Sequence, residues 1–476
     1  FGLSGKVVIF DEVHAYDTYM SAILERLLRW LAEVDCTVIM LSATLPKVRR
    51  KALVKAYSGC EDVAKRPYPR ITLAGALHYL DEQTNSSPVC VEIPKDKAST
   101  VNLCFNSTDL SILTNTISKS LEHGGCVAVI CNTVNRSIEV YKHLRDDLKG
   151  TEFLLFHART LQMWRREREA EVLRKFDKGA KQVDGTYSNP DRPKRAVLVA
   201  TQVIEQSLDL DFDLMFSEIA PVDLLLQRMG RLHRHPRRRP SGLESPQFIV
   251  LCDAKAVGPP PESFGKSIEY VYDRYVLLRT WLALRQRREI VLPNEIEALV
   301  EEVYGESNVA GDEEWGNVLS RAKKQMELAR RESEKAAGNL LVCRPKDPGD
   351  LIEEFNTQLA DDENPEVHKT VRAATREGDP SIAVVMLPLD KTIKPTPDLS
   401  EVRELLDRSA KLSHRGLFQI LLEMKSPTEW AKNAHLRHTR LLRLDGHNQT
   451  QVGDYMLTVD ERLGIVIEKE GGEKNE

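Results

Sequence analysis

An acidic string, Asp11-Glu12-Val13-His14, directly follows the apolar run 7–10. The run is typical of a buried strand, and open parallel sheets bind ligands at the carboxyl ends of their strands. Mg2+ prefers oxygen ligands and keeps most of its waters, so Asp11 can serve as its protein ligand beside a phosphate. Glu12 is suited to polarise an attacking water, and His14 reaches the same strand end. The alternative is a surface acidic turn that follows a core strand.

A second string contains Gln227, Arg231 and Arg234, which are spaced four and three residues apart on one helical face or its immediate continuation. Guanidinium groups stay charged and bind phosphate oxygens in a forked geometry, as phosphoryl transfer requires. The apolar residues 224–226 anchor this string against a core, which argues against a merely solvated basic helix end. For the following Arg237–Arg239, by contrast, we expect a solvated cluster, or at most a contact with a phosphate backbone.

Two further strings bring hydroxyl and amide groups to strand ends. Ser42 and Thr44 follow an apolar run, although ordinary turn chemistry explains them equally well. The loop 201–209 gathers hydroxyl, amide and carboxylate groups where a core would require apolar residues. Thr201 could meet a nucleic-acid phosphate there, while Asp209 could face a nucleotide. Together the strings predict the parts of an ATP motor that depends on nucleic acid.

Strands that alternate with helices predict a parallel, doubly wound α/β sheet. A helix is expected at 18–34, followed by a strand at 37–41 that is covered on both faces. Residues 47–105 are interpreted as transitional, with short strands near 70–75, 88–93 and 100–105. A second series then begins. Its predicted elements are strands at 127–131, 153–156, 195–200, 212–217 and 247–252, helices at 134–148, 161–177 and from Pro221, and a loop at 178–194; a hairpin at 453–468 is expected near the end of the chain.

Length and composition are ordinary for globular protein. A chain of 476 residues suggests about three domains at roughly 150 residues each. No apolar run approaches the ~18 residues needed to span a bilayer, so we expect no membrane partner. The eight cysteines form no C-x-x-C pair, which favours reduced thiols in a cytosolic protein. Because the net charge is −5, a nucleic-acid site must be a local basic surface.

The strings at 11–14, 42–44, 201–209 and 227–234 resemble motifs II, III, V and VI of superfamily 2 helicases of the DExH kind. The full sequences of 201–213 and of the arginine string are similar to those of the CRISPR-associated helicase–nuclease of type I interference systems. Within these systems, we expect type I-E. Cys131-Asn132-Thr133 and His157-Ala158-Arg159 fit the strand-end motifs of the second lobe of that enzyme.

This resemblance implies a 3′-to-5′ single-stranded-DNA translocase that uses ATP and Mg2+ in the cytoplasm of a prokaryote. An RNA-guided surveillance complex of the Cascade type would recruit it to unwind and degrade foreign DNA. The residues expected at the nucleotide are Asp11 as the metal ligand, Glu12, His14 and Gln227 as catalytic groups, and Asp209, Arg231 and Arg234 as nucleotide contacts. The residues expected on nucleic acid are Ser42, Thr44, Asn132, Thr133, His157, Arg159, Thr201 and Gln202.

The resemblance also implies a division of the chain. We expect the carboxyl-side part of a first RecA-like lobe at 1–95, a complete second RecA-like lobe at 96–258, a helical linker at 259–366 and a small α+β accessory domain at 367–476.

The sequence departs from this family in two ways. It contains no phosphate-binding loop of the form G-x-x-x-x-G-K-[ST]; Gly265-Lys266-Ser267 is not one, because Pro260 stands at the position of the first glycine and prolines lack N–H donors. None of the twelve histidines precedes an aspartate, so the dyad of the family's HD nuclease is missing, and with it the transition-metal site. We therefore expect an upstream segment to supply both parts, and this chain alone to be inactive.

Two other functions remain open from the sequence. One is a different DExH helicase that acts on RNA or in DNA repair, against which the long wording of 203–213 argues. The other is a non-catalytic DNA-binding subunit without a phosphate-binding loop. Such a scaffold would have no need of Glu12, Gln227, Arg231 and Arg234.

Overall fold

The computed structural model forms two compact units. The first comprises Phe1–Thr100, Asp273–Gln286 and Val291–Gly378, and the second Val101–Tyr272, Arg287–Ile290 and Asp379–Glu476. Within these limits the structure describes residues 3–13, 18–59, 69–74, 89–90, 98–205, 208–253, 258–305, 312–338, 341, 381–394 and 396–469. His14 and the predicted border between linker and accessory domain lie outside the described residues.

The first unit opens with the predicted strand–helix–strand arrangement. Strand β1 (Val7–Phe10) pairs in parallel with β2 (Thr37–Met40), and helix α1 (Thr18–Glu33) connects them. The prediction that strand 37–41 is covered on both faces is wrong for the described part of the chain, because Ile39 is 42% and Leu41 48% exposed. In β1, likewise, Val7 is 60% and Ile9 61% exposed. Alternate residues turn inward instead, against α1 and against helix α2 (Lys47–Ser58).

Helix α2 lies in the segment that the sequence analysis interpreted as transitional. Its many basic residues obscure the apolar periodicity, and packing of Leu53 and Ala56 against α1 stabilises the helix. Gly59, in the left-handed conformation at φ 73°, ends it. The other elements of this unit are β3 (Arg70–Ile71), β4 (Val89–Cys90), α8 (Arg274–Leu284), α9 (Ile296–Tyr304) and α10 (Asp312–Gly338).

A seven-stranded sheet forms the core of the second unit, with the strand order β13-β5-β12-β11-β6-β10-β7. All pairs from β5 to β7 are parallel, which confirms the predicted doubly wound α/β class. The strands are β5 (Ser99–Asn106), β6 (Gly125–Ile130), β7 (Glu152–Phe156), β10 (Arg195–Ala200), β11 (Leu214–Glu218), β12 (Gln247–Leu251) and β13 (Glu289–Leu292).

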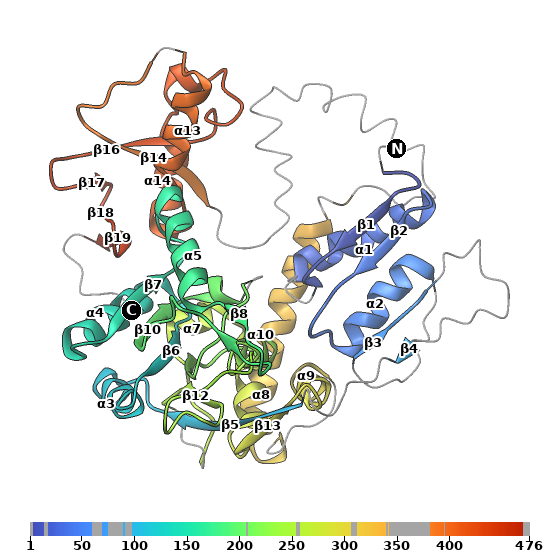
Figure 1. Cartoon of the computed structure of the whole chain (residues 1–476). Helices are drawn as coiled ribbons and strands as arrows, with labels where there is room; N and C mark the ends of the chain where they lie inside the picture. The colour runs from blue at the N-terminus through green and yellow to red at the C-terminus, as the bar shows by residue number, and fades with distance from the viewer. Residues whose placement is uncertain are drawn as a thin grey trace. The chain divides into compact units, whose positions relative to one another are not determined.

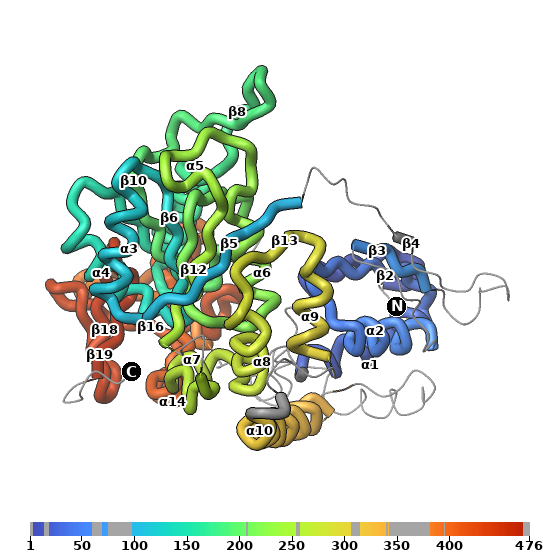
Figure 2. Tube along the Cα trace, turned by 90° about the horizontal axis from the view of Figure 1, so that it is seen from below, coloured from blue at the N-terminus to red at the C-terminus, as the bar shows by residue number. Residues whose placement is uncertain are grey.

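Consecutive residues of the central strands are fully buried, as expected for a parallel sheet that is covered on both faces. One face packs against α3 and α4. The loop predicted at 178–194 contains a short hairpin that projects from the unit (Figure 2) and leaves Val183 fully exposed. The other elements are α3 (Leu110–Ser120), α4 (Val134–Asp147), α5 (Gln162–Phe176), β8 (Ala180–Lys181), β9 (Tyr187–Ser188), the 3-10 turn Gln202–Ile204, α6 (Val222–Met229) and α7 (Lys266–Val271).

The C-terminal region belongs to the same compact unit as this sheet. Its main hydrophobic core is a cluster distinct from that of the seven-stranded sheet, and it includes Leu161, just before α5 (Figure 1). The predicted terminal hairpin is confirmed by the antiparallel pair β18–β19. The elements of this region are β14 (Ile382–Pro388), α13 (Leu399–Asp407), β15 (Ser409–Leu412), α14 (Arg415–Glu423), the 3-10 turn Thr428–Trp430, β16 (Arg440–Leu444), β17 (Gln449–Val452), β18 (Tyr455–Asp460) and β19 (Gly464–Lys469).

The turn between β18 and β19 packs against the residues that follow β7 and is hydrogen-bonded to them. The Ile465 amide donates to the Arg159 carbonyl at 3.0 Å, and His157 Nε2 lies 3.0 Å from the Leu463 carbonyl oxygen. Gly464 has φ +75°, and a Cβ there would lie 2.4 Å from the Arg159 carbonyl oxygen. Only glycine fits this close approach.

We therefore predict that Gly464→Ala lowers the free energy of unfolding by more than about 1 kcal/mol, because alanine is strained at positive φ and overlaps the backbone. Denaturant titration measures the change. Gly446→Ala is the matched control, since no atom lies within 4 Å of its built Cβ. Equal stability of both variants would contradict the tight docking of the hairpin.

Candidate functional site

Parallel pairing brings the polar strand ends of the second unit to one edge of the sheet. Strand β10 lies between β6 and β7, and the backbone continues the pairing beyond the strands. The Cys131 amide donates to the Ala200 carbonyl at 2.8 Å, and the Thr201 amide donates to the Phe156 carbonyl at 3.2 Å. This edge gathers six residues expected on nucleic acid, namely Asn132, Thr133, His157, Arg159, Thr201 and Gln202.

Side chains connect these strand ends to one another. Gln202 Nε2 donates to the Asn132 carbonyl at 2.8 Å and to the Tyr272 hydroxyl at 3.0 Å. The Asn132 amide donates to Glu218 Oε2 at 2.6 Å, which fixes the end of β6 against the end of β11. The Thr133 hydroxyl accepts from the first turn of α4 and caps that helix. The loops at this edge therefore form one hydrogen-bonded surface.

His157 and Arg159 lie beneath the C-terminal hairpin. His157 is fully buried, and burial together with the neighbouring Arg159 charge lowers its pKa to about 3. It is neutral at physiological pH and brings no positive charge to a phosphate. Burial also lowers the pKa of Arg159 to about 10, and its guanidinium donates to Asn135 Oδ1 at 2.6 Å. Their part in nucleic-acid binding stays a prediction.

The arginine string begins on α6, which follows Pro221 as predicted, and continues beyond the helix. Arg231 donates to the Leu208 carbonyl and, at 3.0 Å, to the Glu205 carbonyl. Arg234 Nε lies 2.7 Å from Asp209 Oδ1. The two predicted nucleotide-facing elements, the loop 201–209 and the arginine string, are thus joined directly.

Asp209 is the charged centre of this junction. Besides Arg234 it contacts His235 Nε2 at 2.8 Å and Lys178 Nζ at 3.4 Å. Partial burial acts to raise the pKa of the Asp209 carboxyl, but the hydrogen bond from His235 and the charge of Arg234 outweigh it and hold the pKa below its usual value. The carboxylate therefore stays ionised between its cationic neighbours.

Arg228 is a functional candidate that the sequence analysis missed. It is fully buried and forms an ion pair with Glu205 at 2.6 Å, and its Nη1 donates to the Ser217 hydroxyl at 2.7 Å. Its Nη2 donates to the Tyr272 hydroxyl, which also accepts from Gln202. Arg228 lies between apolar residues on the buried face of α6. A charge at such a position requires a buried partner, and that was the overlooked signal.

The expectation that Arg237–Arg239 are solvated is wrong for two of the three. Arg237 and Arg239 side chains are 5% and 6% exposed and face Asp211. The chain is extended here, so alternate side chains point in opposite directions, and Arg238 alone is exposed.

The acidic string lies in the first unit at the ends of β1 and β2. Glu12 has φ 53°, and its amide donates to Asp11 Oδ1 at 2.9 Å. The neighbouring strand end carries Ser42, whose hydroxyl donates to the Thr44 carbonyl at 3.4 Å. Asp11 is exposed at this strand end, as a ligand of hydrated Mg2+ must be. Among the described residues, no three His, Cys, Asp or Glu side chains form a ready metal cluster.

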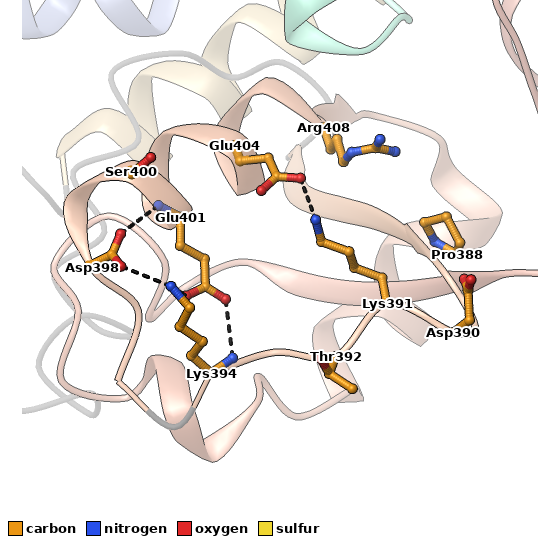
Figure 3. Close-up of a pocket in the computed structure, with 10 residues that line it drawn as sticks. All are labelled: Pro388, Asp390, Lys391, Thr392, Lys394, Asp398, Ser400, Glu401, Glu404 and Arg408. Carbon is orange, nitrogen blue, oxygen red and sulfur yellow. Dashed lines mark hydrogen bonds and ion pairs between the residues drawn. The ribbon is translucent and has the colours of Figure 1, made fainter.

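A hollow of about 640 Å3 lies in the C-terminal region, beside the N-terminal part of α13 (Figure 3). Its lysines are already paired, with Lys394 Nζ 2.9 Å from Asp398 Oδ2 and Lys391 Nζ 2.5 Å from Glu404 Oε1. Four carboxylates face three basic groups, so the hollow does not favour phosphate. Its lining is Pro388, Asp390, Lys391, Thr392, Lys394, Asp398, Ser400, Glu401, Glu404 and Arg408. In the described part of the chain, no helix is long and apolar enough to cross a membrane.

Comparisons with known proteins agree with this geometry. Two family models match, "CRISPR-associated nuclease/helicase Cas3, C-terminal" at residues 123–237 and "Cas3 C-terminal domain" at 376–465. The CRISPR-associated endonuclease/helicase Cas3 of Thermus thermophilus is 34% identical across 98% of this chain, and the chain spans 54% of that relative. The T. fusca Cas3-ATP crystal structure matches with a TM-score of 0.79 at 27% identity, over 98% of this chain and 54% of that one.

A further match is a structure of a CRISPR RNA-guided surveillance complex before nicking, with a TM-score of 0.75 and 26% identity over 98% of this chain and 57% of that one. The parallel sheet, its polar strand ends and the arginine string are those of a RecA-like lobe of a superfamily 2 helicase. More narrowly, the chain belongs to the Cas3 family and corresponds to the C-terminal portion of its helicase–nucleases.

We predict a pH-dependent loss of stability from His157. Its folded pKa is about 3 against an ordinary 6.5, so the unfolded chain takes up this proton first as the pH falls. The contribution of neutral, buried His157 to the free energy of unfolding is complete above pH ~6.5. Below that pH it declines by up to ~1.4 kcal/mol per pH unit. Unfolding free energies measured from pH 7 to 4 should decline less steeply for His157→Gln than for the unaltered protein. The exposed His123 supplies the control, as His123→Gln should leave the slope unchanged.

Proposed function

We propose that this chain supplies the second motor lobe of an ATP-dependent, 3′-to-5′ single-stranded-DNA translocase in a type I CRISPR helicase–nuclease, most closely of type I-E. The observation that carries the proposal is the direct connection between the arginine string and the polar strand ends. Arg231 binds the carbonyl of Glu205, whose carboxylate holds Arg228, and Arg228 and Gln202 share the Tyr272 hydroxyl. A change at the phosphates would therefore reach the DNA-facing loops through five residues, Arg231, Glu205, Arg228, Tyr272 and Gln202.

At the nucleotide, Arg231 and Arg234 stabilise the charge that develops on the transferring phosphoryl group. The Arg234 side chain is 40% exposed and so remains open to a phosphate beside Asp209. Gln227 lies in the last turn of α6, four residues before Arg231, and would orient an attacking water. Glu12, in the first unit, keeps its predicted role of polarising such a water. Asp11 would hold Mg2+, which supplies charge neutralisation at the phosphates. His14 is proposed as a further catalytic group, and Asp209 as a contact of the nucleotide.

At the DNA, the hydroxyl groups of Thr201 and Thr133 would donate to the phosphate backbone, with Ser42 and Thr44 serving in the first unit. Such contacts fix the strand without reading its bases. Sequence choice then comes from a guide RNA, which is why a surveillance complex is the proposed recruiting partner. This chain is similar in structure to one chain of a solved CRISPR RNA-guided surveillance complex, which supports that proposal. The setting would be the cytoplasm of a prokaryote.

We further propose that the chain alone does not turn over ATP. Its 476 residues contain no G-x-x-x-x-G-K-[ST] loop and no His-Asp dyad. A backbone loop that cradles the β- and γ-phosphates is needed in addition to the arginines. The phosphate-binding loop and the HD nuclease would come from a further segment of the same enzyme.

Substitutions of the two arginines and of Thr201 distinguish the proposed nucleotide site from the proposed DNA-binding surface. In the protein complemented with such a segment, Arg231→Ala and Arg234→Ala should each lower ATP turnover by about 10³ or more, because each removes a charge from the transition state. Both should leave single-stranded-DNA affinity largely intact. Thr201→Ala should instead weaken DNA stimulation more than nucleotide binding. Steady-state ATPase assays and DNA binding by fluorescence anisotropy measure these effects, and an equal loss of DNA affinity in the arginine variants would assign these residues to the DNA.

A further inference from the structure

Two buried aspartates flank Phe212, the residue that pairs with the backbone of the arginine string. Asp211 and Asp213 are 0% and 2% exposed, and Phe212 lies between them. The Phe212 amide donates to the Arg231 carbonyl at 3.0 Å, and the Phe212 carbonyl accepts from the His233 amide at 3.0 Å. Phe212 therefore holds the main chain of the arginine string at two points, Arg231 and His233. Its own neighbours in the sequence are the two buried carboxylates.

Arg239 connects these aspartates. It donates to both oxygens of Asp211, from Nη1 at 3.0 Å and Nη2 at 2.9 Å, and from Nη1 to Asp213 Oδ1 at 2.7 Å. Its Nη2 also donates to the His235 carbonyl at 2.9 Å, and so closes the chain back on itself. From the other side, Arg192 donates to Asp213 Oδ2 at 3.0 Å. A guanidinium can span two carboxylates in this way, whereas a lysine cannot.

An inner strand of the sheet, β6, anchors this cluster. The Cys126 amide, at the start of β6, donates to Asp213 Oδ2 at 2.7 Å, and the Asp213 amide donates back to the Cys126 carbonyl at 2.9 Å. Burial acts to raise the pKa of Asp213, but Arg192 and Arg239 outweigh it and keep the pKa below its usual value. The carboxylate therefore favours its ionised form and is bonded to the start of a fully buried strand.

We propose that Arg239, through Asp211 and Asp213, is a positioning residue that fixes the backbone of the arginine string and thereby directs Arg231 and Arg234. The catalytic consequence rests on the proposed function, whereas the ordering of the backbone does not. Arg239 acts on Arg231 and Arg234 indirectly. The path runs through the Asp211 and Asp213 carboxylates and the backbone hydrogen bonds of Phe212.

The alternation along Arg237–Arg239 supplies a matched control. Arg238 carries the same charge and is adjacent in the chain, but its side chain is exposed. A contribution of Arg239 to DNA binding through charge alone would be shared by Arg238. Burial of the Arg239 guanidinium removes it from such a role.

Hydrogen exchange of the chain tests the ordering without any activity. Arg239→Gln should raise exchange of the Phe212 and His233 amides by about tenfold or more relative to the amides of β6, since it removes the restraint on this local segment. Arg238→Gln should leave both amides unchanged. Unchanged protection of these amides in Arg239→Gln would overturn the proposal.

Kinetics of the complemented protein test the consequence. Arg239→Gln should lower kcat for ATP by about ten- to a hundredfold, with KM for ATP and DNA affinity nearly unchanged, because small misplacement of a catalytic group has effects of this size. Arg239→Lys keeps a positive charge beside Asp211 and Asp213 but lacks the fork that bonds both carboxylates, and so separates charge from positioning. The proposal expects kcat to remain low in Arg239→Lys; recovery of kcat together with Tm would show that the charge alone suffices and overturn it. If the unaltered complemented protein shows no ATPase, the proposed function fails and the exchange result still stands by itself.

Discussion

Parallel alignment of the strands is the constraint on which the rest of this structure depends. Because β6, β7, β10 and β11 run in one direction, the polar residues that follow them meet at a single edge. Both faces of these strands are buried, so their polar side chains lie at or near the strand ends, where they find hydrogen-bond partners. Segments as distant in sequence as Asn132 and Gln202 thereby come within one hydrogen bond of each other.

Buried charges then give this edge a defined shape. Arg228 with Glu205, and Arg239 with Asp211 and Asp213, place fully paired ions inside the protein. Such pairs contribute little net stability, because the desolvation of each ion offsets their attraction. Loss of one partner is strongly unfavourable, however, so alternative arrangements of the loop 201–209 and the arginine string are suppressed. We regard this specificity as their main contribution.

The strand ends and the motifs that follow them could be predicted from the sequence because apolar runs and polar strings are local features. The partners of those residues could not. Arg237–Arg239 formed a basic run in the sequence, yet only knowledge of Asp211 across the fold distinguishes Arg238 from its neighbours. His157 was expected at the DNA, and its contact with Leu463 joins residues about three hundred positions apart. Helix α2 was missed because tertiary packing, rather than periodicity, stabilises it.

The central claim is that this chain contributes the arginine and DNA-binding half of an ATP-hydrolysing site. Single-stranded-DNA-stimulated ATPase activity tests it most directly, with the chain alone and with the part of the Thermus thermophilus relative that the chain does not match. The account predicts no turnover by the chain alone and turnover on mixing that Glu12→Gln in this chain abolishes. Turnover by the chain alone, or none with a complementing polypeptide shown to be folded and to bind it, would contradict the account.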